Sequence, residues 1–313
     1  MPSFPAILPA TPRTFAGTPL MRSLIATGMG LLVTGCTPQA TPENSKVLAP
    51  STQPQVPLTL RVDVREGTFD CDVYLPRQKR PVPLVVVAHG FSRSKASMAD
   101  WGRRLAQEGF VAAVPTLPAW SDHARNGRAI CELVDWLQAR PDMRDLVDTR
   151  RIGLVGFSAG GLATLLAAAD DPRVAVWVGL DPVDRDGQGM AAASRLKCPS
   201  LVLRAEPHAC NAHGNAAGIV RSLGGENTCL LVIGATHTDA EWPTDGMAEW
   251  VCGKSSAERR AVFVRYALSA LRAVLLSDQA ASLALSKAKD DARVKVLNQG
   301  KWMAQDGEHP LNK

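Results

Sequence analysis

Gly156, Ser158 and Gly160 have the types and spacing that could make a serine hydroxyl a nucleophile. They form a Gly-x-Ser-x-Gly pattern between an apolar run ending at Val155 and a helix-like stretch beginning at Leu162. In a strand–turn–helix of this kind, glycines let strand and helix approach closely, and the strained turn holds the hydroxyl outward. The helix N-terminus then favours negative charge that develops beside the hydroxyl. The pattern predicts a nucleophile at Ser158; the alternative is a serine that only caps the helix.

His237 is the histidine best placed to act as the general base that a serine hydroxyl needs. The chain has six histidines, and this one follows directly after the last long apolar run, residues 230–236. The order serine, acid, histidine along the chain also fits the turn motif. We therefore predict His237 as the base, with an ordinary loop histidine as the alternative.

Two carboxylates are candidates for the acid that accepts the other imidazole N–H and fixes its tautomer. Asp181 stands directly at the end of the apolar run 174–180, and Glu206 follows the next run. Glu206 has the commoner position, although it could instead be a surface carboxylate paired with Arg204. Because Asp181 is shorter, stiffer and at the strand tip, we expect it to be the acid and keep Glu206 as the alternative.

The oxyanion that forms during acyl transfer needs two backbone N–H donors. One is predicted to be that of Ala159, the residue after the nucleophile, and the other that of Phe91, in the loop after the apolar run 82–88. The side chains of Phe91, Trp120 and Trp242 are candidates to line an apolar substrate pocket. Core packing is the alternative for these aromatic side chains.

The pattern of apolar runs predicts the framework that must position these groups. Alternating segments at 58–65 and 69–75 predict a hairpin. Further strands are predicted at 82–88, 110–114, 152–156, 174–180, 200–204 and 229–233, and helices at 98–108, 128–138, 162–169, 212–223 and 256–276. Their alternation predicts an α/β fold, a mostly parallel twisted sheet with helices on both faces. Ligands bind beyond the carboxyl ends of such strands, which is where the candidate residues fall.

The composition and net charge of the chain fit one folded domain, and they indicate no nucleic-acid partner. The chain has 313 residues, of which 46% are hydrophobic and 21% charged, and we place a single domain at residues 58–276. The net charge of +5 comes without a dense basic run, so no nucleic-acid partner is expected. The cluster of His208, Cys210 and His213 matches no standard zinc spacing, so neither a metal nor another cofactor is expected.

The first 36 residues have the layout of an export signal. Arg22 precedes a short apolar segment, 24–33, and small residues lead to Cys36. The segment is too short to span a bilayer. Cys36 resembles the acylated cysteine of a bacterial lipobox, which implies a lipid anchor in the membrane and a domain facing the periplasm or the exterior. A plain signal peptide is the alternative.

Two further segments flank the expected domain. Residues 37–57 are rich in Pro, Thr, Gln and Ser, which predicts a flexible tether. Residues 277–313 form a C-terminal tail to which the sequence assigns no role.

Export would place the six cysteines other than Cys36 in an oxidising compartment, where an even number suggests disulfides. Cys198 and Cys229 each precede an apolar run, whereas Cys210 and Cys252 each follow one. We therefore predict the pairs Cys198–Cys229 and Cys210–Cys252, with buried free thiols as the alternative.

Six motifs in order resemble the chlorophyllase branch of the α/β-hydrolases. They are Ala88-His89-Gly90-Phe91, then residues 109–111, 134–137, 156–161 and 179–184, and finally His237-Thr238-Asp239. This branch is related to the platelet-activating-factor acetylhydrolases and to bacterial cutinase-like polyester hydrolases. In chlorophyllases and acetylhydrolases the acid matches Asp181, and in cutinase-like enzymes it matches Glu206. The sequence departs from chlorophyllases at Phe157, where they usually have histidine.

The resemblance covers roughly residues 58–275 and implies a serine esterase that needs no metal or organic cofactor. We expect hydrolysis of a small or lipid-like carboxylic ester through an acyl-enzyme and a Ser-His-Asp triad. A peptidase or thioesterase on the same fold is one alternative. A non-catalytic binding protein at the cell envelope is another, since fold does not establish function. The oligomeric state is not predicted.

Overall fold

A computed structural model describes residues 56–78 and 81–300 of the chain. The predicted signal segment with Cys36, and the predicted tether as far as residue 55, lie outside the described residues. The last thirteen residues of the predicted tail, 301–313, also lie outside them.

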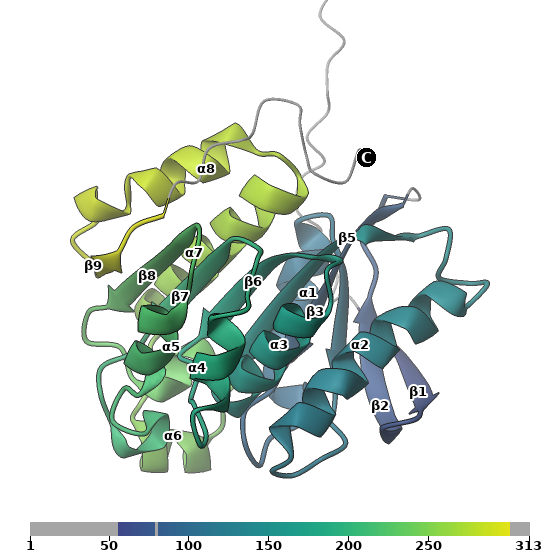
Figure 1. Cartoon of the computed structure of the whole chain (residues 1–313), viewed down its shortest axis with the longest axis horizontal. Coiled ribbons are helices and arrows are strands. Elements are labelled where there is room, and N and C mark those ends of the chain that lie inside the picture. The colour runs from purple at the N-terminus through teal and green to yellow at the C-terminus, as the bar shows by residue number, and fades with distance from the viewer. Residues whose placement is uncertain (1–55, 79–80, 301–313) are drawn as a thin grey trace, which may run out of the picture. The chain divides into compact units, whose positions relative to one another are not determined.

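The described strands form one nine-stranded sheet in the order β1-β2-β4-β3-β5-β6-β7-β8-β9 (Figure 1). Strands β3 to β8 are parallel, and antiparallel strands complete both edges, β1 and β2 at one and β9 at the other. The strands are β1 Leu58–Val64, β2 Gly67–Tyr74, β3 Val82–Ala88, β4 Val111–Pro115, β5 Val147–Phe157, β6 Val174–Leu180, β7 Ser200–Arg204, β8 Asn227–Val232 and β9 Val294–Asn298.

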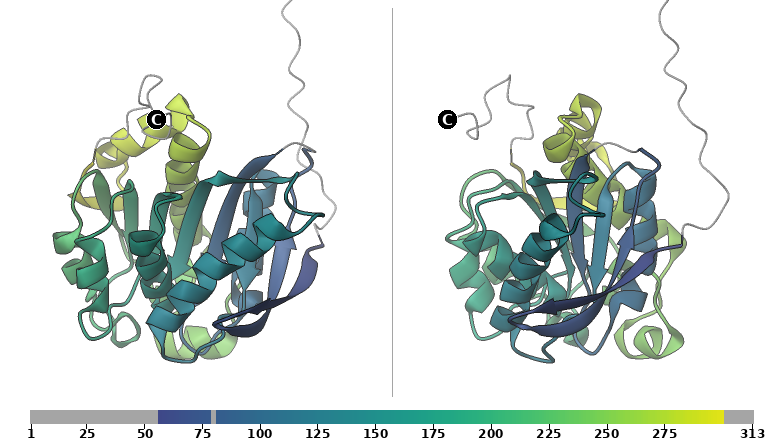
Figure 2. Two further views of the ribbon diagram at one scale, coloured as in Figure 1. Left: turned by 45° about the vertical axis from the view of Figure 1, so that its right-hand side comes forward. Right: turned by 90° about the vertical axis from the view of Figure 1, so that its right-hand side faces the viewer.

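Helices cover the sheet on both faces (Figure 2), which explains why central strands such as β3 are continuously apolar and fully buried. One core packs α1, α7 and α8 on the sheet, and the other packs α2, α3, α4 and α5 on the opposite face. The helices are α1 Ala99–Gln107, α2 His123–Ala139, α3 Ala159–Asp170, α4 Gln188–Ala193, α5 Ala216–Ser222, α6 Gly246–Cys252, α7 Ala257–Leu275 and α8 Gln279–Ser286, with 3-10 turns η1 Lys95–Met98, η2 Ala209–Asn211, η3 His237–Ala240 and η4 Ala288–Asp290. The predicted α/β architecture is therefore confirmed. None of the helices in the described ranges is long and apolar enough to cross a membrane.

The sheet continues beyond the predicted end of the domain at Leu276. Helix α8 packs on α7, and β9 pairs antiparallel with β8 through partners such as Val294 and Val232. Part of the predicted tail therefore belongs to the folded domain, and the boundary at residue 276 is too early. The sequence did not mark β9 as a strand because it is a short edge strand of five residues, most of whose side chains are not buried.

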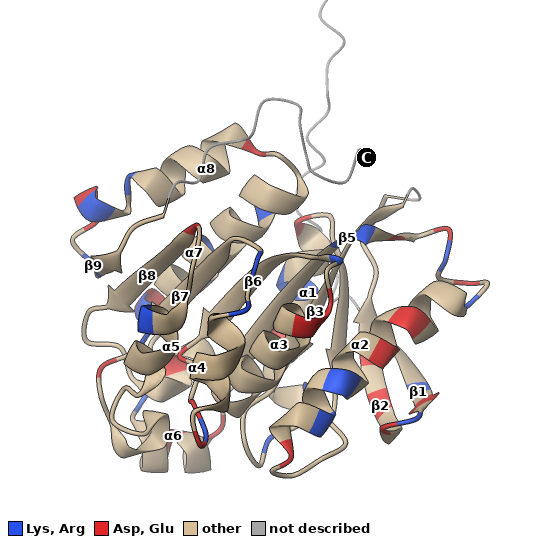
Figure 3. Ribbon diagram, in the orientation of Figure 1, with Lys and Arg blue, Asp and Glu red and all other residues tan. Residues whose placement is uncertain are grey.

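Opposite charges lie close together on the surface. Figure 3 shows basic residues on the first turns of α2 and acidic residues further along it. Arg128 of this helix pairs with Glu66 at 2.6 Å, and Asp135 pairs with Arg173 at 2.6 Å. Pairs this exposed contribute less than about 1 kcal/mol each, so they join α2 to its neighbours without dominating stability.

Of the two predicted disulfides, the structure contains one. Cys210 and Cys252 are bonded, with their Cα atoms 5.6 Å apart. Cys198 and Cys229 are free thiols, so the prediction of a Cys198–Cys229 pair is wrong.

The register of β7 and β8 explains why these two cysteines do not pair. Ser200 lies opposite Asn227. Cys198 comes two residues before Ser200, and Cys229 comes two residues after Asn227, so they are offset by four residues along the strands. That offset is roughly 13 Å at about 3.3 Å per residue. Disulfides join Cα atoms less than about 7 Å apart.

Alkylation should distinguish the free thiols from the disulfide. Burial raises the pKa of the Cys131, Cys198 and Cys229 thiols to about 12, so we expect slow alkylation of the native protein at pH 8. In denaturant without reductant these thiols should react fully, whereas Cys210 and Cys252 should react only after reduction. Peptide mass spectrometry would check this, and a peptide cross-linked through Cys198 and Cys229 would contradict it.

Candidate active site

Ser158 is the single residue between the end of β5 and the start of α3. Its φ of 54° and ψ of −121° are unusual for a residue with a side chain and cost about 1–3 kcal/mol. The turn is held by its N–H, which donates to the Leu180 carbonyl at 3.1 Å, and by its carbonyl, which accepts from the Val183 N–H at 3.1 Å. Its side chain makes no capping hydrogen bond to α3, so the geometry does not favour the capping alternative.

The two glycines of the pattern are required by close approach. A Cβ at Gly160 would clash with the carbonyl oxygens of Ala88 and His89, and one at Gly156 would clash with the Gly160 carbonyl and the Thr164 hydroxyl. The tight turn therefore brings α3 directly against the end of β3. This contact places the residue after the nucleophile beside the loop that carries Phe91.

Asp181 and His237 meet at the carboxyl ends of β6 and β8. His237 begins η3, and its Nδ1 lies 2.6 Å from Oδ2 of Asp181. The aspartate is fully buried and the histidine is 5% exposed. The Ala205 N–H donates to the other carboxylate oxygen at 3.0 Å. Because the carboxylate accepts from Nδ1, the Nε2 of the imidazole is left to act as an acceptor.

The His237 ring lies beside the serine turn. Its centroid is 4.6 Å from that of Phe157, the residue before Ser158. Within the described residues no hydrogen bond joins the Ser158 hydroxyl to His237. Catalytic hydrogen bonds are often long in structures without substrate and shorten when substrate binds. The three predicted groups therefore gather at one edge of the sheet, beyond the ends of β5, β6 and β8.

Glu206, the alternative acid, is directed elsewhere. Its carboxylate accepts a hydrogen bond from the Gly234 N–H at 3.2 Å, and it has no hydrogen bond to His237 among the described residues. The geometry therefore favours Asp181.

Phe91 and Ala159, the predicted oxyanion donors, both line a cavity of 260 Å³. His89 fixes the loop before Phe91, because its Nδ1 lies 2.8 Å from the Gly90 carbonyl and its Nε2 accepts from the Leu117 N–H at 2.9 Å. Since the carbonyl can only accept, Nδ1 carries the hydrogen. Burial lowers the pKa of His89, which favours this neutral tautomer. His89 is therefore a structural residue of the loop.

Aromatic side chains form one edge of this cavity. Phe91 and Trp120 meet edge to face with centroids 4.9 Å apart and are 52% and 66% exposed. Trp242, the third predicted pocket residue, does not lie here. It packs on Trp101 and lines a separate cavity of 670 Å³ between α1 and α7. His123, which no sequence motif singled out, does line the smaller cavity.

Three further residues near the site escaped the sequence analysis: Arg93, Glu241 and Asn211. Arg93 follows the Phe91 loop and binds the buried carboxylate of Glu241 through two hydrogen bonds, of 2.6 and 3.0 Å. It also pairs with Asp245, the N-cap of α6, at 2.8 Å. These contacts join the Phe91 loop to the segment after His237. No sequence pattern marks them, because the partners are 148 residues apart.

Loss of Arg93 should destabilise the fold. Arg93→Met leaves the Glu241 carboxylate, whose side chain is 1% exposed, without its partner, and we expect a loss of about 3 kcal/mol in the free energy of unfolding. The double variant Arg93→Met/Glu241→Met should recover most of it. Urea unfolding would measure both.

The matched control is Arg61→Met, since Arg61 pairs with Asp70 at 2.9 Å with both side chains exposed. That change should cost less than about 1 kcal/mol. Equal losses at Arg61 and Arg93 would contradict the importance of burial for the Arg93–Glu241 pair.

The part of the chain that the structure describes contains no group of three or more His, Cys, Asp or Glu side chains able to hold a metal ion.

Comparisons with known proteins show which family and relatives the chain resembles. A family described as PET hydrolase-like matches residues 37–251. A bis(hydroxyethyl) terephthalate hydrolase of Streptomyces coelicolor is 31% identical over 159 residues, 49% of each chain. Cutinase 2 of Thermobifida cellulosilytica is 26% identical over 43% of this chain and 51% of its own, and the quorum-quenching protein AidA of Acinetobacter baumannii is 27% identical over 48% and 53%. The chain spans about half the length of the curated relatives it matches.

Proposed function

Because the chain belongs to the PET hydrolase-like family, we propose that it is a serine hydrolase that cleaves carboxylic esters. Its fold is that of the α/β-hydrolases. The observation that carries the proposal is the 2.6 Å contact between the buried Asp181 carboxylate and His237, beside the strained turn at Ser158. A buried carboxylate, an imidazole and a strained serine at the strand ends are what acyl transfer needs.

In the proposed mechanism, Ser158 attacks the ester carbonyl while Nε2 of His237 takes the hydroxyl proton. Asp181 holds the imidazole in the correct tautomer and stabilises its positive charge. The N–H groups of Phe91 and Ala159 bind the oxyanion of the tetrahedral intermediate. His237 then returns the proton to the leaving alcohol, and water hydrolyses the acyl-enzyme by the same steps.

The proposed substrate is an ester with an apolar or aromatic group next to the scissile bond. A cavity of 260 Å³ is small for a ligand site, so it would hold the ester and its nearest groups. The exposed rings of Phe91 and Trp120 would contact the next part of the substrate. Relatives named as a terephthalate-ester hydrolase and as cutinases support this class.

Covalent labelling tests the proposal directly. A fluorophosphonate should label the protein, and peptide mass spectrometry should place the adduct on Ser158. The same protein should hydrolyse p-nitrophenyl esters faster than matched thioesters and peptide anilides. Faster peptide or thioester turnover would favour those alternatives, and a wild-type protein that is neither labelled nor active would favour a non-catalytic binding protein.

We further propose that the enzyme is exported and anchored by acylation of Cys36, which lies outside the described residues. The Cys210–Cys252 disulfide supports an oxidising compartment. Growth of the expressing bacteria with a labelled fatty acid should label the wild-type protein and leave Cys36→Ala unlabelled. Equal labelling of both proteins would contradict acylation at this residue.

A further inference from the structure

We propose that Asn211 is a positioning residue that holds the Asp181 carboxylate in the orientation His237 requires. This inference rests on the proposed function, since it concerns the acid of the proposed triad. Asn211 ends η2, the short turn after β7, and is 1% exposed. The polar atoms of a buried side-chain amide need hydrogen-bond partners, and the identity of those partners indicates the role of the residue.

The four hydrogen bonds of the Asn211 side chain fix its orientation. Its Oδ1 accepts from the N–H groups of His208 at 2.8 Å and Gly214 at 2.9 Å. Its Nδ2 donates to the Glu206 carbonyl at 2.9 Å and to Oδ2 of Asp181 at 3.0 Å. Rotation of the amide by 180° would put an oxygen against two oxygens and a donor against two donors. The amide N–H therefore points at the triad carboxylate.

The bond to Asp181 falls on the oxygen that matters for the imidazole. Oδ2 receives both the Asn211 amide and Nδ1 of His237, while Oδ1 receives the Ala205 N–H. With donors on both oxygens the carboxylate cannot rotate about its Cβ–Cγ bond without breaking a hydrogen bond. The oxygen that faces Nδ1 of His237 is therefore held in place.

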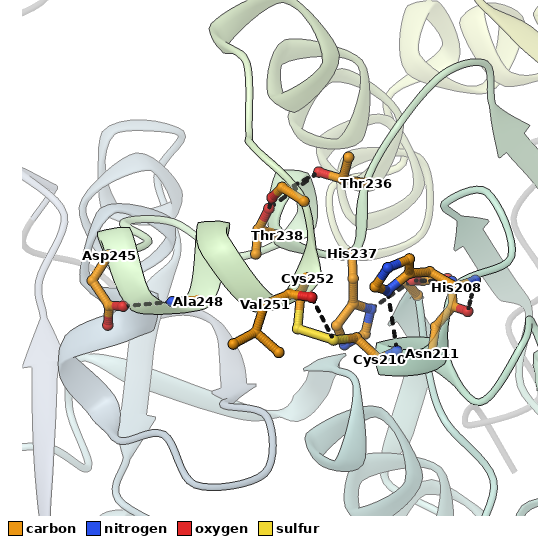
Figure 4. The surroundings of a disulfide bond; sticks show 12 residues. His208, Cys210, Asn211, Thr236, His237, Thr238, Asp245, Ala248, Val251 and Cys252 are labelled. Carbon is orange, nitrogen blue, oxygen red and sulfur yellow. Dashed lines mark hydrogen bonds and ion pairs between the residues drawn. A yellow bond between two sulfur atoms is a disulfide. The ribbon is translucent and has the colours of Figure 1, made fainter.

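The segment that carries Asn211 is joined to the segment that carries His237. Cys210, next to Asn211, is bonded to Cys252 at the end of α6 (Figure 4). The following carbonyl, that of Gly253, accepts hydrogen bonds from the hydroxyls of Thr236 and Thr238, on either side of His237. The acid and the base are therefore connected through one continuous set of contacts.

Asn215 offers a matched control. Like Asn211, it joins the loop after β7 to the segment after β6, because its Oδ1 accepts from the Asp184 N–H at 3.0 Å and its Nδ2 donates to the Asp184 carbonyl at 2.8 Å. It has no hydrogen bond to Asp181 or His237 among the described residues. Loss of the Asn215 amide removes two hydrogen bonds between loops, compared with four at Asn211, and leaves the triad carboxylate with its donors.

The first test compares Asn211→Ala with Asn215→Ala in p-nitrophenyl ester hydrolysis. Loss of a hydrogen bond to a charged group should lower kcat about 10- to 100-fold for Asn211→Ala, with KM changed less than about 3-fold. Asn215→Ala should keep kcat within about 3-fold of the wild type. Equal kcat values for the two variants would overturn the proposal.

The second test uses Asn211→Asp, which keeps the acceptor that the N–H groups of His208 and Gly214 need. The titratable and charged groups near Asp181 and the loop after β7 are His237 on η3, the Cys229 thiol on β8, Arg204 at the end of β7, and Glu206 and His208 of the loop itself. An added carboxylate beside Asp181 favours protonated imidazole, so the acidic limb of the pH profile of kcat/KM should move to higher pH. Asn215→Asp should leave it in place. A folded Asn211→Asp protein with the wild-type profile would overturn the proposal.

The wild type separates this inference from the proposed function. If the wild type neither hydrolyses esters nor reacts with a fluorophosphonate, the proposed function fails, and the positioning role fails with it. If the wild type is active and labelled at Ser158, a wild-type kcat in Asn211→Ala overturns the positioning role alone. Circular dichroism and urea unfolding of each variant would identify a loss of activity that comes from unfolding.

Discussion

Replacement of Ser158 by alanine is expected to lower kcat for ester hydrolysis by about six orders of magnitude, to the rate that the remaining site supports. The variant loses the oxygen that forms the acyl-enzyme, and no other described hydroxyl sits at the turn between β5 and α3. It keeps the Asp181–His237 contact and the backbone donors of Phe91 and Ala159, so substrate binding should remain. The measurement is hydrolysis of a p-nitrophenyl ester at saturating substrate.

The control for this change is Ser194→Ala, because Ser194 is an exposed serine at the end of α4 whose hydroxyl donates to the Ala191 carbonyl, within its own helix. Its kcat should equal that of the wild type. Alanine keeps a Cβ, so most of the backbone strain at the positive φ of residue 158 remains in the variant. We therefore expect little change in the free energy of unfolding. An active Ser158→Ala protein would mean that another group carries the chemistry.

The groups that could be predicted are those whose roles follow from position along one strand. Ser158 and Asp181 directly follow β5 and β6, and His237 follows β8 after four intervening residues; parallel strands bring such ends to the same edge. The central strands were equally accessible to prediction, since burial on both faces leaves a continuous apolar run such as β3.

What could not be predicted depends on contacts between segments distant in sequence. The prediction of a Cys198–Cys229 disulfide was wrong because the register of β7 and β8 offsets the two cysteines by four residues. Trp242 failed because the loop after η3 turns toward Trp101, away from the cavity that Phe91 lines. Arg93 and Asn211 belong to no pattern at all, because their partners lie 148 and 30 residues away.

Replacement of Asp181 by asparagine is expected to lower kcat by about four orders of magnitude, whereas Glu206→Gln should change it less than about 3-fold. Asparagine fits the same space but cannot stabilise imidazolium. If its amide NH2 faced Nδ1 it would also impose the wrong tautomer. Glutamine at 206 keeps an oxygen for the Gly234 N–H, which is the contact that Glu206 makes in the structure. The two variants therefore distinguish the two acid positions found among related hydrolases.

The pH profile sharpens this comparison, because a carboxylate that faces the imidazole favours its protonated form. In Asp181→Asn the acidic limb of the profile should move to lower pH, and in Glu206→Gln it should stay where it is. A large loss of kcat in Glu206→Gln, together with an active Asp181→Asn protein, would identify Glu206, after β7, as the acid. Such a result would require the β7–α5 loop to rearrange on substrate binding, because in the structure the buried carboxylate at 181 is the one in contact with His237.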